Sequence, residues 1–81
     1  MITIYGKEGC TFCDQAKALC ESKGVGFKYL TLGVDYERES FIQMMQDEYN
    51  IMPRTMPQIV DGDVYIGGFT ELKNKLLTSL L

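Results

Sequence analysis

Histidine is absent from the 81-residue sequence. Its absence excludes the commonest general base, the Cys-His nucleophile pair and the usual nitrogen ligand of a zinc site. Positive charge is scarce as well, because eight lysines and arginines stand against eleven acids and leave a formal charge of −3. This balance argues against a protein whose main partners are nucleic acids or membrane lipids, so we expect neither kind of partner.

Long hydrophobic runs are also lacking. The longest apolar runs are a few residues, and residues 1–5 lack the cationic region and long apolar stretch of a signal peptide. Cysteine is limited to Cys10, Cys13 and Cys20, an odd number that cannot form the disulfide framework of a small secreted protein. We therefore expect a cytoplasmic protein in a reducing compartment. The composition, with 46% hydrophobic residues, suits a single globular domain over residues 1–81.

Hydrophobic periodicity predicts elements in the order β-α-β-α-β-β-α. Alternating, β-branched or aromatic stretches predict strands over residues 2–5, 27–32, 58–60 and 64–66. Apolar residues at steps of three and four predict a first helix over residues 11–23, which Gly24 ends. Asp35 and Thr70 are the expected caps of the second and third helices.

The two later helices should each bury one apolar stripe. The stripe of the second helix comprises Phe41, Met44, Met45 and Tyr49, and that of the third comprises Leu72, Leu76, Leu77 and Leu80. A helix joins the first two strands, which should therefore be parallel. Asp61-Gly62-Asp63 predicts a hairpin between the last two strands, because Asp-Gly tolerates positive φ. The expected structure is an α/β fold in which three helices flank a four-stranded mixed sheet.

Cys10-Thr11-Phe12-Cys13 is a Cys-x-x-Cys motif between the first strand and the first helix. A closed structural zinc site needs four ligands, which three cysteines without histidine cannot supply, so the position favours thiol redox chemistry. At a helix N-terminus, unpaired N–H groups and the helix dipole favour the thiolate, which makes Cys10 the expected nucleophile. Cys13 lies one turn deeper and should act as the resolving thiol.

The environment of the two cysteines determines how far the pKa of Cys10 falls. A helix dipole alone lowers it by less than about one unit. A larger effect would need hydrogen bonds from the N–H groups of Phe12 and Cys13, together with a cation, for which Lys7 is the candidate. The residues leave open whether Lys7 is instead an ordinary solvated lysine. Cys20 is expected to be a small buried side chain.

Three segments together resemble the glutaredoxins: KEGCTFC at residues 7–13, TMPQIV at residues 55–60 and GGFTEL at residues 67–72. The resemblance covers essentially the whole chain and implies the thioredoxin fold. It also implies that Pro57 is a cis proline facing the cysteine pair. Because a residue before proline is extended, Met56 could then offer its backbone N–H and C=O to the cysteinyl backbone of a bound thiol.

The same resemblance implies that glutathione lies across Cys10 as a co-substrate, and no metal is expected. Its glycine carboxylate should lie near Lys7, and its γ-glutamyl end near the glycine pair and the start of the last helix. The expected glutathione-binding residues are Lys7, Thr11, Phe12, Thr55, Met56, Pro57, Gly68, Phe69, Thr70 and Glu71. Taken singly, Gly68 is also consistent with a plain turn, Thr70 with a helix cap and Glu71 with an acid in the first turn of a helix.

The resemblance predicts a monomeric glutathione-dependent thiol-disulfide oxidoreductase that reduces protein disulfides and glutathione mixed disulfides. A ribonucleotide reductase is a natural client at the family level. The familiar dithiol motif of the family has proline and tyrosine where this chain has Thr11 and Phe12. Relatives without that proline can share a [2Fe-2S] cluster between two subunits, so a dimeric cluster carrier stays open as an alternative. An electron donor reduced by a thioredoxin-type reductase is the other alternative.

Overall fold

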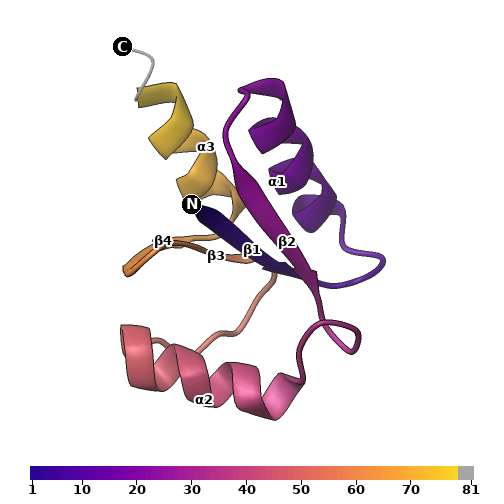
Figure 1. The fold of residues 1–81 in the computed structure, drawn as a ribbon, viewed down its shortest axis with the longest axis vertical. Helices are drawn as coiled ribbons and strands as arrows, with labels where there is room; N and C mark the ends of the chain where they lie inside the picture. The colour runs from indigo at the N-terminus through magenta and orange to yellow at the C-terminus, as the bar shows by residue number, and fades with distance from the viewer. Residues whose placement is uncertain (79–81) are drawn as a thin grey trace.

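The structure is a computed structural model in which residues 1–78 are described. The strands are β1 (Ile2–Gly6), β2 (Phe27–Thr31), β3 (Gln58–Asp61) and β4 (Val64–Gly67). The helices are α1 (Thr11–Ser22), α2 (Arg38–Tyr49) and α3 (Phe69–Thr78). Over these residues the order of elements is the predicted β-α-β-α-β-β-α (Figure 1). None of these helices is long and apolar enough to cross a bilayer.

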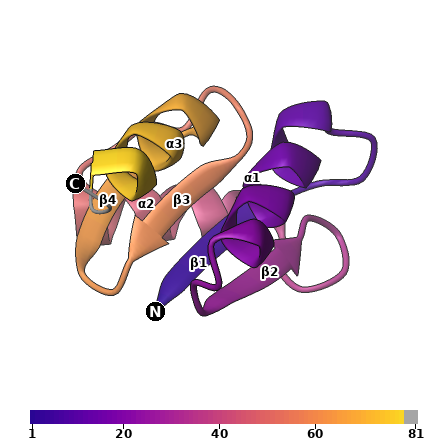
Figure 2. The same ribbon diagram turned by 90° about the horizontal axis from the view of Figure 1, so that it is seen from above.

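The four strands form one mixed sheet in the order β2-β1-β3-β4. β1 pairs in parallel with β2 and antiparallel with β3, and the β3–β4 hairpin is antiparallel, as predicted. Helices α1 and α3 lie side by side on one face of the sheet, and α2 covers the other face (Figures 1 and 2). The predicted α/β architecture is confirmed.

The alternation of β1 determines which side chains enter each layer. Its buried residues include Ile2 and Ile4, which join the core cluster beneath α1 and α3. The rest of this cluster comprises the buried residues Ala16, Cys20, Ile59, Leu72 and Leu76. Tyr5, on the opposite face, packs against Phe41 of α2 with ring centroids 4.9 Å apart. Burying each large apolar side chain stabilises the fold by about 1.5–3 kcal/mol, so both helix layers contribute to holding the sheet.

The predicted cap of α2 is wrong. Glu37 occupies the N-cap position without a side-chain hydrogen bond to the helix. Asp35 is engaged elsewhere, because its carboxylate accepts a hydrogen bond from the backbone N–H of Thr31 at 2.8 Å. The chain turns back on itself before the helix begins, and the N–H of Gly33 donates to the carbonyl of Tyr36 at 2.8 Å. Asp35 therefore stabilises this turn and leaves α2 to start three residues later, at Arg38.

The predicted start and apolar stripe of α3 also need correction. The helix begins at Phe69, so Thr70 lies inside its first turn and is not its cap. Leu72 and Leu76 are buried as predicted, whereas Leu77 is 44% exposed. Successive helical residues are about 100° apart, so Leu77 is turned away from the face that Leu72 and Leu76 share. Leu80 lies outside the described residues.

The stripe of α2 is only partly as predicted. Phe41 and Met45, which are four residues apart, are buried, whereas Met44 and Tyr49 are half-buried. Tyr49 is held at the rim of the helix because its hydroxyl donates to the carbonyl of Gly62, in the β3–β4 turn, at 2.8 Å. A single helix face therefore packs on this side of the sheet, and its edges stay in contact with solvent.

Candidate active site around the Cys10–Cys13 pair

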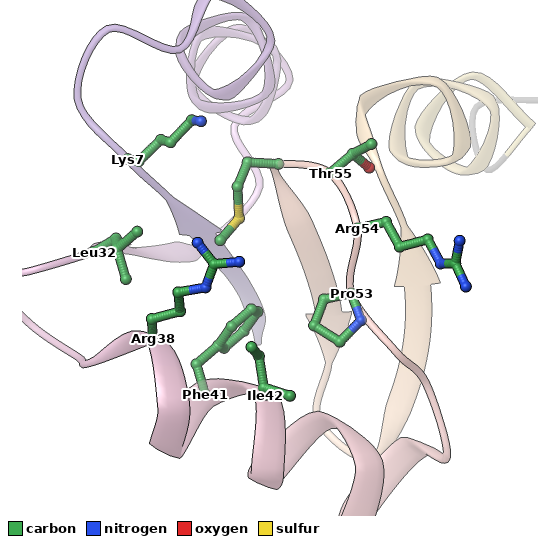
Figure 3. A pocket seen from close by; sticks show the side chains of 9 residues that line it. Lys7, Leu32, Arg38, Phe41, Ile42, Pro53, Arg54 and Thr55 are labelled. Carbon is green, nitrogen blue, oxygen red and sulfur yellow. The ribbon is translucent and has the colours of Figure 1, made fainter.

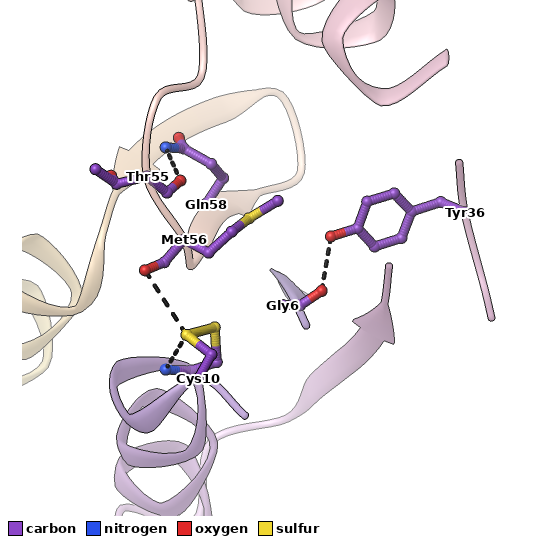
Figure 4. Close-up of a disulfide and its surroundings, with 7 residues drawn as sticks. Gly6, Cys10, Tyr36, Thr55, Met56 and Gln58 are labelled. Carbon is purple, nitrogen blue, oxygen red and sulfur yellow. Dashed lines mark hydrogen bonds between the residues drawn. A yellow bond between two sulfur atoms is a disulfide. The ribbon is translucent and has the colours of Figure 1, made fainter. Parts of the chain in front are cut away.

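Cys10 and Cys13 lie at the start of α1 and form a disulfide with their Cα atoms 5.2 Å apart (Figure 4). Gly9 turns the chain into the helix with a φ of +70°, a conformation that favours glycine. Cys10 is the N-cap residue, and its Sγ accepts a hydrogen bond from the backbone N–H of Cys13 at 3.2 Å. The sulfur thus occupies the position of a capping oxygen, where a helix stabilises negative charge.

The two cysteines differ in their access to solvent. Cys13 is fully buried, whereas Cys10 retains 9% of its exposure. Cys10 is therefore the more accessible of the two cysteines, as the motif predicted. Of the two N–H groups that a large lowering of the Cys10 pKa would need, only that of Cys13 is in place, since the backbone N–H of Phe12 makes no hydrogen bond to Cys10 in the described chain. In this helix only the N–H three residues after the cap points at the sulfur.

The segment before β3 brings a second backbone surface to the cysteine pair. The Met56–Pro57 peptide bond is cis, as the resemblance implied. The carbonyl oxygen of Met56 lies 3.8 Å from the Sγ of Cys10 (Figure 4). Among residues 1–78, no hydrogen bond engages the backbone N–H of Met56. The residue whose carbonyl lies beside the Cys10 sulfur thus also carries a free backbone donor.

Two hollows flank this segment and share Thr55 and Met56. The first, called the cationic hollow, is lined by Lys7, Leu32, Arg38, Phe41, Ile42, Pro53, Arg54, Thr55 and Met56. Lys7 follows β1 and Arg38 begins α2, so the two line this hollow from separate segments, whereas the guanidinium of Arg54 turns away from the other side chains (Figure 3). Neither Lys7 nor Arg38 forms an ion pair within the described residues. The hollow therefore offers two unneutralised cations to an anionic group.

The second, called the glycine hollow, is lined by Phe12, Thr55, Met56, Pro57, Gly68, Phe69, Thr70 and Glu71. Phe12 of α1 and Phe69 of α3 both line it, with their ring centroids 6.0 Å apart. Glu71 reaches back to accept a hydrogen bond from the N–H of Gly68 at 2.7 Å. Gly67 has a φ of +125°, and a Cβ there would lie 2.8 Å from the Cγ of Glu71. Glycine therefore permits the close approach of this carboxylate to the strand end.

One family of known proteins matches this chain. The glutaredoxin family model matches residues 2–66. A glutaredoxin from Neisseria meningitidis serogroup A is 37% identical over 71 residues, which cover 88% of this chain and 79% of that protein. Glutaredoxin 3 of Escherichia coli K12 is 39% identical over 72 residues, which cover 88% of this chain and 80% of that protein. The chain belongs to the glutaredoxin family.

Solved glutaredoxin structures show the same thioredoxin fold. The crystal structure of glutaredoxin 1 from Francisella tularensis, complexed with cacodylate, matches with a TM-score of 0.80 and 32% identity. The match covers 98% of this chain and 94% of that one. A buckwheat glutaredoxin–glutathione complex matches with a TM-score of 0.77 and 19% identity over 96% of this chain and 69% of that one. With its disulfide-forming Cys10–Cys13 pair, this glutaredoxin is a thiol-disulfide oxidoreductase.

The fold gathers most of the residues that the glutaredoxin resemblance named. Of the expected glutathione-binding residues, Lys7 lines the cationic hollow, Thr55 and Met56 line both hollows, and the others except Thr11 line the glycine hollow. Thr11 is exposed in the first turn of α1 and lines neither hollow. Their contacts with glutathione stay a prediction.

Arg38 is the residue of the hollows that sequence reasoning missed. It is the first residue of α2, where a cation faces the positive end of the helix dipole. That unfavourable placement was the signal that could have identified it. Its approach to Lys7 depends on packing between segments about thirty positions apart, which no local pattern reveals.

Tyr36 supports the loop that leads to the glutaredoxin cysteines. Its hydroxyl donates to the carbonyl of Gly6, the last residue of β1, at 2.7 Å (Figure 4). Its ring packs against Tyr5 and Phe41 with centroids 5.4 and 5.0 Å away. Burial, with smaller contributions from Tyr29 and Tyr5, raises the pKa of Tyr36 to about 12. The neutral hydroxyl therefore fixes the end of β1 at ordinary pH.

Proposed function

We propose that this chain reduces protein disulfides and glutathione mixed disulfides, with glutathione as the electron donor. The observation that carries the proposal is the position of the Cys10 sulfur. It lies at the N-cap of α1 and 3.8 Å from the carbonyl oxygen of Met56. Met56 itself lines both hollows. A thiolate there is stabilised by the Cys13 N–H and is placed beside backbone groups that can align a peptide.

The exchange with a glutathione mixed disulfide needs Cys10 alone. Its thiolate attacks the glutathionyl sulfur, forms a mixed disulfide with glutathione and releases the client thiolate, which takes up a proton. A second glutathione thiolate then attacks the glutathionyl sulfur held on Cys10. Oxidised glutathione leaves, and the thiolate of Cys10 is restored.

Reduction of a protein disulfide needs both cysteines. Cys10 attacks one client sulfur and forms a mixed disulfide, while the other client sulfur leaves as a thiolate. The thiolate of Cys13 then attacks the sulfur of Cys10, which releases the second client thiol and forms the Cys10–Cys13 disulfide. Two glutathione molecules return this disulfide to the dithiol and become one molecule of oxidised glutathione.

The two hollows match the two ends of glutathione. The glycine carboxylate suits the cationic hollow, where Lys7 and Arg38 are unpaired. The γ-glutamyl end carries an ammonium and a carboxylate, which suit the Glu71 carboxylate and the N-terminal end of α3 in the glycine hollow. The cysteinyl residue between them would pair with the backbone of Met56. The buckwheat glutaredoxin crystallised with glutathione shares this fold and adds support.

The setting in which the enzyme works is part of the same proposal. We propose that residues 1–81 function as one glutaredoxin-like domain, as a monomer in the cytoplasm. Support comes from the family match over residues 2–66 and from the three cysteines, which are too few for a secreted disulfide framework. A ribonucleotide reductase is the proposed client class, on the family resemblance alone.

Three cysteine variants test the proposed roles. Cys10→Ser should abolish reduction of both a glutathionylated peptide and a protein disulfide in glutathione-coupled assays. Cys13→Ser should keep most of the first activity and lose the second, because only the second needs the resolving thiol. Cys20→Ala is the matched control and should keep both, since Cys20 is buried in the core. Equal loss of both activities in Cys13→Ser would contradict the role of Cys13.

A change of reductant tests the electron source. We expect glutathione to reduce the Cys10–Cys13 disulfide directly. A disulfide that resists glutathione but is reduced by a thioredoxin-type reductase would contradict glutathione dependence and favour the alternative electron donor.

A further inference from the structure

Gln58, the first residue of β3, is a buried polar residue that the proposed chemistry does not use. It is 4% exposed, and both ends of its amide are paired. Its Nε2 donates to the carbonyl of Thr55 at 2.8 Å (Figure 4), and its Oε1 accepts from the hydroxyl of Tyr65 at 2.6 Å. A buried amide contributes to stability only when its hydrogen bonds are satisfied, and this one is engaged at both ends.

Chemistry fixes the direction of this hydrogen-bond chain. A backbone carbonyl can only accept, so the NH2 group of Gln58 must face Thr55. The amide oxygen must then face Tyr65, whose hydroxyl donates. The ring of Tyr65 packs against that of Tyr49 with centroids 6.3 Å apart, which holds it against α2. The chain therefore links β4 to the segment that precedes the cis proline.

The Thr55 carbonyl shares one peptide unit with the Met56 N–H. That unit is planar, and only the following peptide bond, Met56–Pro57, is cis among the described residues. In a trans peptide the C=O and N–H point in opposite directions, so fixing the carbonyl of Thr55 also fixes the direction of the Met56 N–H. This N–H has no partner within residues 1–78, while the carbonyl of Met56 lies 3.8 Å from the Cys10 sulfur.

We propose that Gln58 and Tyr65 are positioning residues that aim the Met56 N–H at the backbone of the substrate's cysteine. The inference rests on the proposed function, in which Met56 pairs with a cysteinyl residue beside Cys10. Gln58 and Tyr65 act through Met56, without contact to the substrate. Their removal should therefore lower kcat/KM for disulfides whose cysteine has peptide groups on both sides. It should leave the rate unchanged for disulfides without peptide groups.

The test compares two substrates in two variants. Gln58→Met keeps the length of the side chain and removes both hydrogen bonds, and Tyr65→Phe removes only the outer one. The first substrate is a glutathionylated peptide, assayed for kcat and KM, and the second is dithiobis(nitrobenzoate), an aromatic disulfide without peptide groups. We expect Gln58→Met to lower kcat/KM for the peptide about tenfold, mainly through KM, and Tyr65→Phe to lower it about threefold. Attack on the aromatic disulfide should stay within about twofold of wild type.

Tyr49→Phe is the matched control. It removes a tyrosine hydroxyl that donates to a backbone carbonyl, that of Gly62, but lies outside the chain to Thr55. We expect it to leave kcat/KM for both substrates unchanged. Equal losses on both substrates in Gln58→Met, or an unchanged kcat/KM for the peptide, would overturn the positioning role. If Gln58→Met folds poorly, Tyr65→Phe is judged by the same two outcomes: equal losses on both substrates, or an unchanged kcat/KM for the peptide, would overturn the positioning role.

A failure of the proposed function can be distinguished from a failure of the positioning role. Wild-type protein that cannot reduce the glutathionylated peptide would overturn glutathione-dependent activity. The same comparison with a peptide disulfide free of glutathione then decides the positioning role, because that substrate also carries peptide groups beside its cysteine. A selective loss in Gln58→Met would uphold it, and an equal or absent loss would overturn it.

Discussion

Lys7 and Arg38 are two cations, unpaired within residues 1–78, that line the cationic hollow, and they come from separate segments of the chain. We expect Lys7→Ala and Arg38→Ala each to raise KM for a glutathionylated peptide about three- to tenfold, because each removes a charge-assisted contact to a carboxylate. The effect should shrink at high salt, since both side chains are exposed. Steady-state kinetics at low and high ionic strength measure both effects.

Arg54→Ala provides the control at this scale. Arg54 belongs to the same hollow and carries the same charge, but its guanidinium turns away (Figure 3). It should change KM less than about twofold. If Arg54→Ala weakened binding as much as Arg38→Ala, general attraction by positive charge would explain the data, and a specific carboxylate contact would not.

At the scale of single elements, Gly67 determines how the end of β4 meets α3. Gly67→Ala places a side chain at a φ of +125° and within 2.8 Å of the Cγ of Glu71. We expect this variant to lose about 1–3 kcal/mol of unfolding free energy and to raise KM for a glutathionylated peptide, because Glu71 must move. Urea denaturation and steady-state kinetics measure the two effects.

Gly62→Ala separates backbone strain from displacement of Glu71. Gly62 also has a positive φ, of +61°, but a Cβ there meets nothing within 4 Å. We expect a loss of about 1–2 kcal/mol with an unchanged KM. A rise in KM of similar size in both glycine variants would rule out a specific role for the contact between Gly67 and Glu71.

The aromatic cluster between the sheet and α2 gives stability a dependence on alkaline pH. Burial first, and then Tyr29 and Tyr5, raises the pKa of Tyr36 from 10.0 to about 12. Between these values the unfolded chain has lost a proton that the folded chain keeps, so the free energy of unfolding should fall as pH rises from about 10 to about 12. Tyr36→Phe should weaken this fall, as measured by urea midpoints across that range. Identical slopes for wild type and Tyr36→Phe would contradict the assignment.

Local patterns were enough to predict the order of the elements, because each strand and helix carries its own periodicity. They were insufficient where two uses of one side chain compete. Asp35 suits a helix cap, but its carboxylate instead accepts the N–H of Thr31 in the preceding turn. Leu77 fits an apolar repeat, yet only the face shared by Leu72 and Leu76 reaches the core.

In the site, too, local patterns predicted some residues and missed those whose roles depend on tertiary packing. The positions of Cys10 and Cys13 followed from a local motif at a helix start. The family resemblance named the residues that line the glycine hollow, but only Lys7, Thr55 and Met56 of those that line the cationic hollow. Arg38 and Gln58 could not be recognised, because their roles depend on which distant segments they approach. Gln58 resembles an ordinary strand residue until its amide is seen between Tyr65 and the Thr55 carbonyl.

At the scale of the whole molecule, the mixed sheet brings the start of α1, the segment before β3 and the start of α3 to one place. Cys13 lies within disulfide reach of Cys10, so the second thiol competes with any cluster that would use Cys10 as a ligand. We expect protein purified without oxygen to be a colourless monomer, by size-exclusion chromatography and visible absorbance. A coloured dimer after iron and sulfide reconstitution with glutathione would favour the cluster-carrier alternative.

The central claim is that the assembled site keeps the Cys10 sulfur ionised and accessible. The most direct test is the pH dependence of Cys10 alkylation by iodoacetamide in the reduced protein, with Lys7→Ala beside wild type. The account predicts a midpoint below the value of about 8.5 for a free cysteine, and a small upward shift in Lys7→Ala. A wild-type midpoint at about 8.5 would contradict it, since the α1 N-terminus would then leave Cys10 no more reactive than an ordinary thiol.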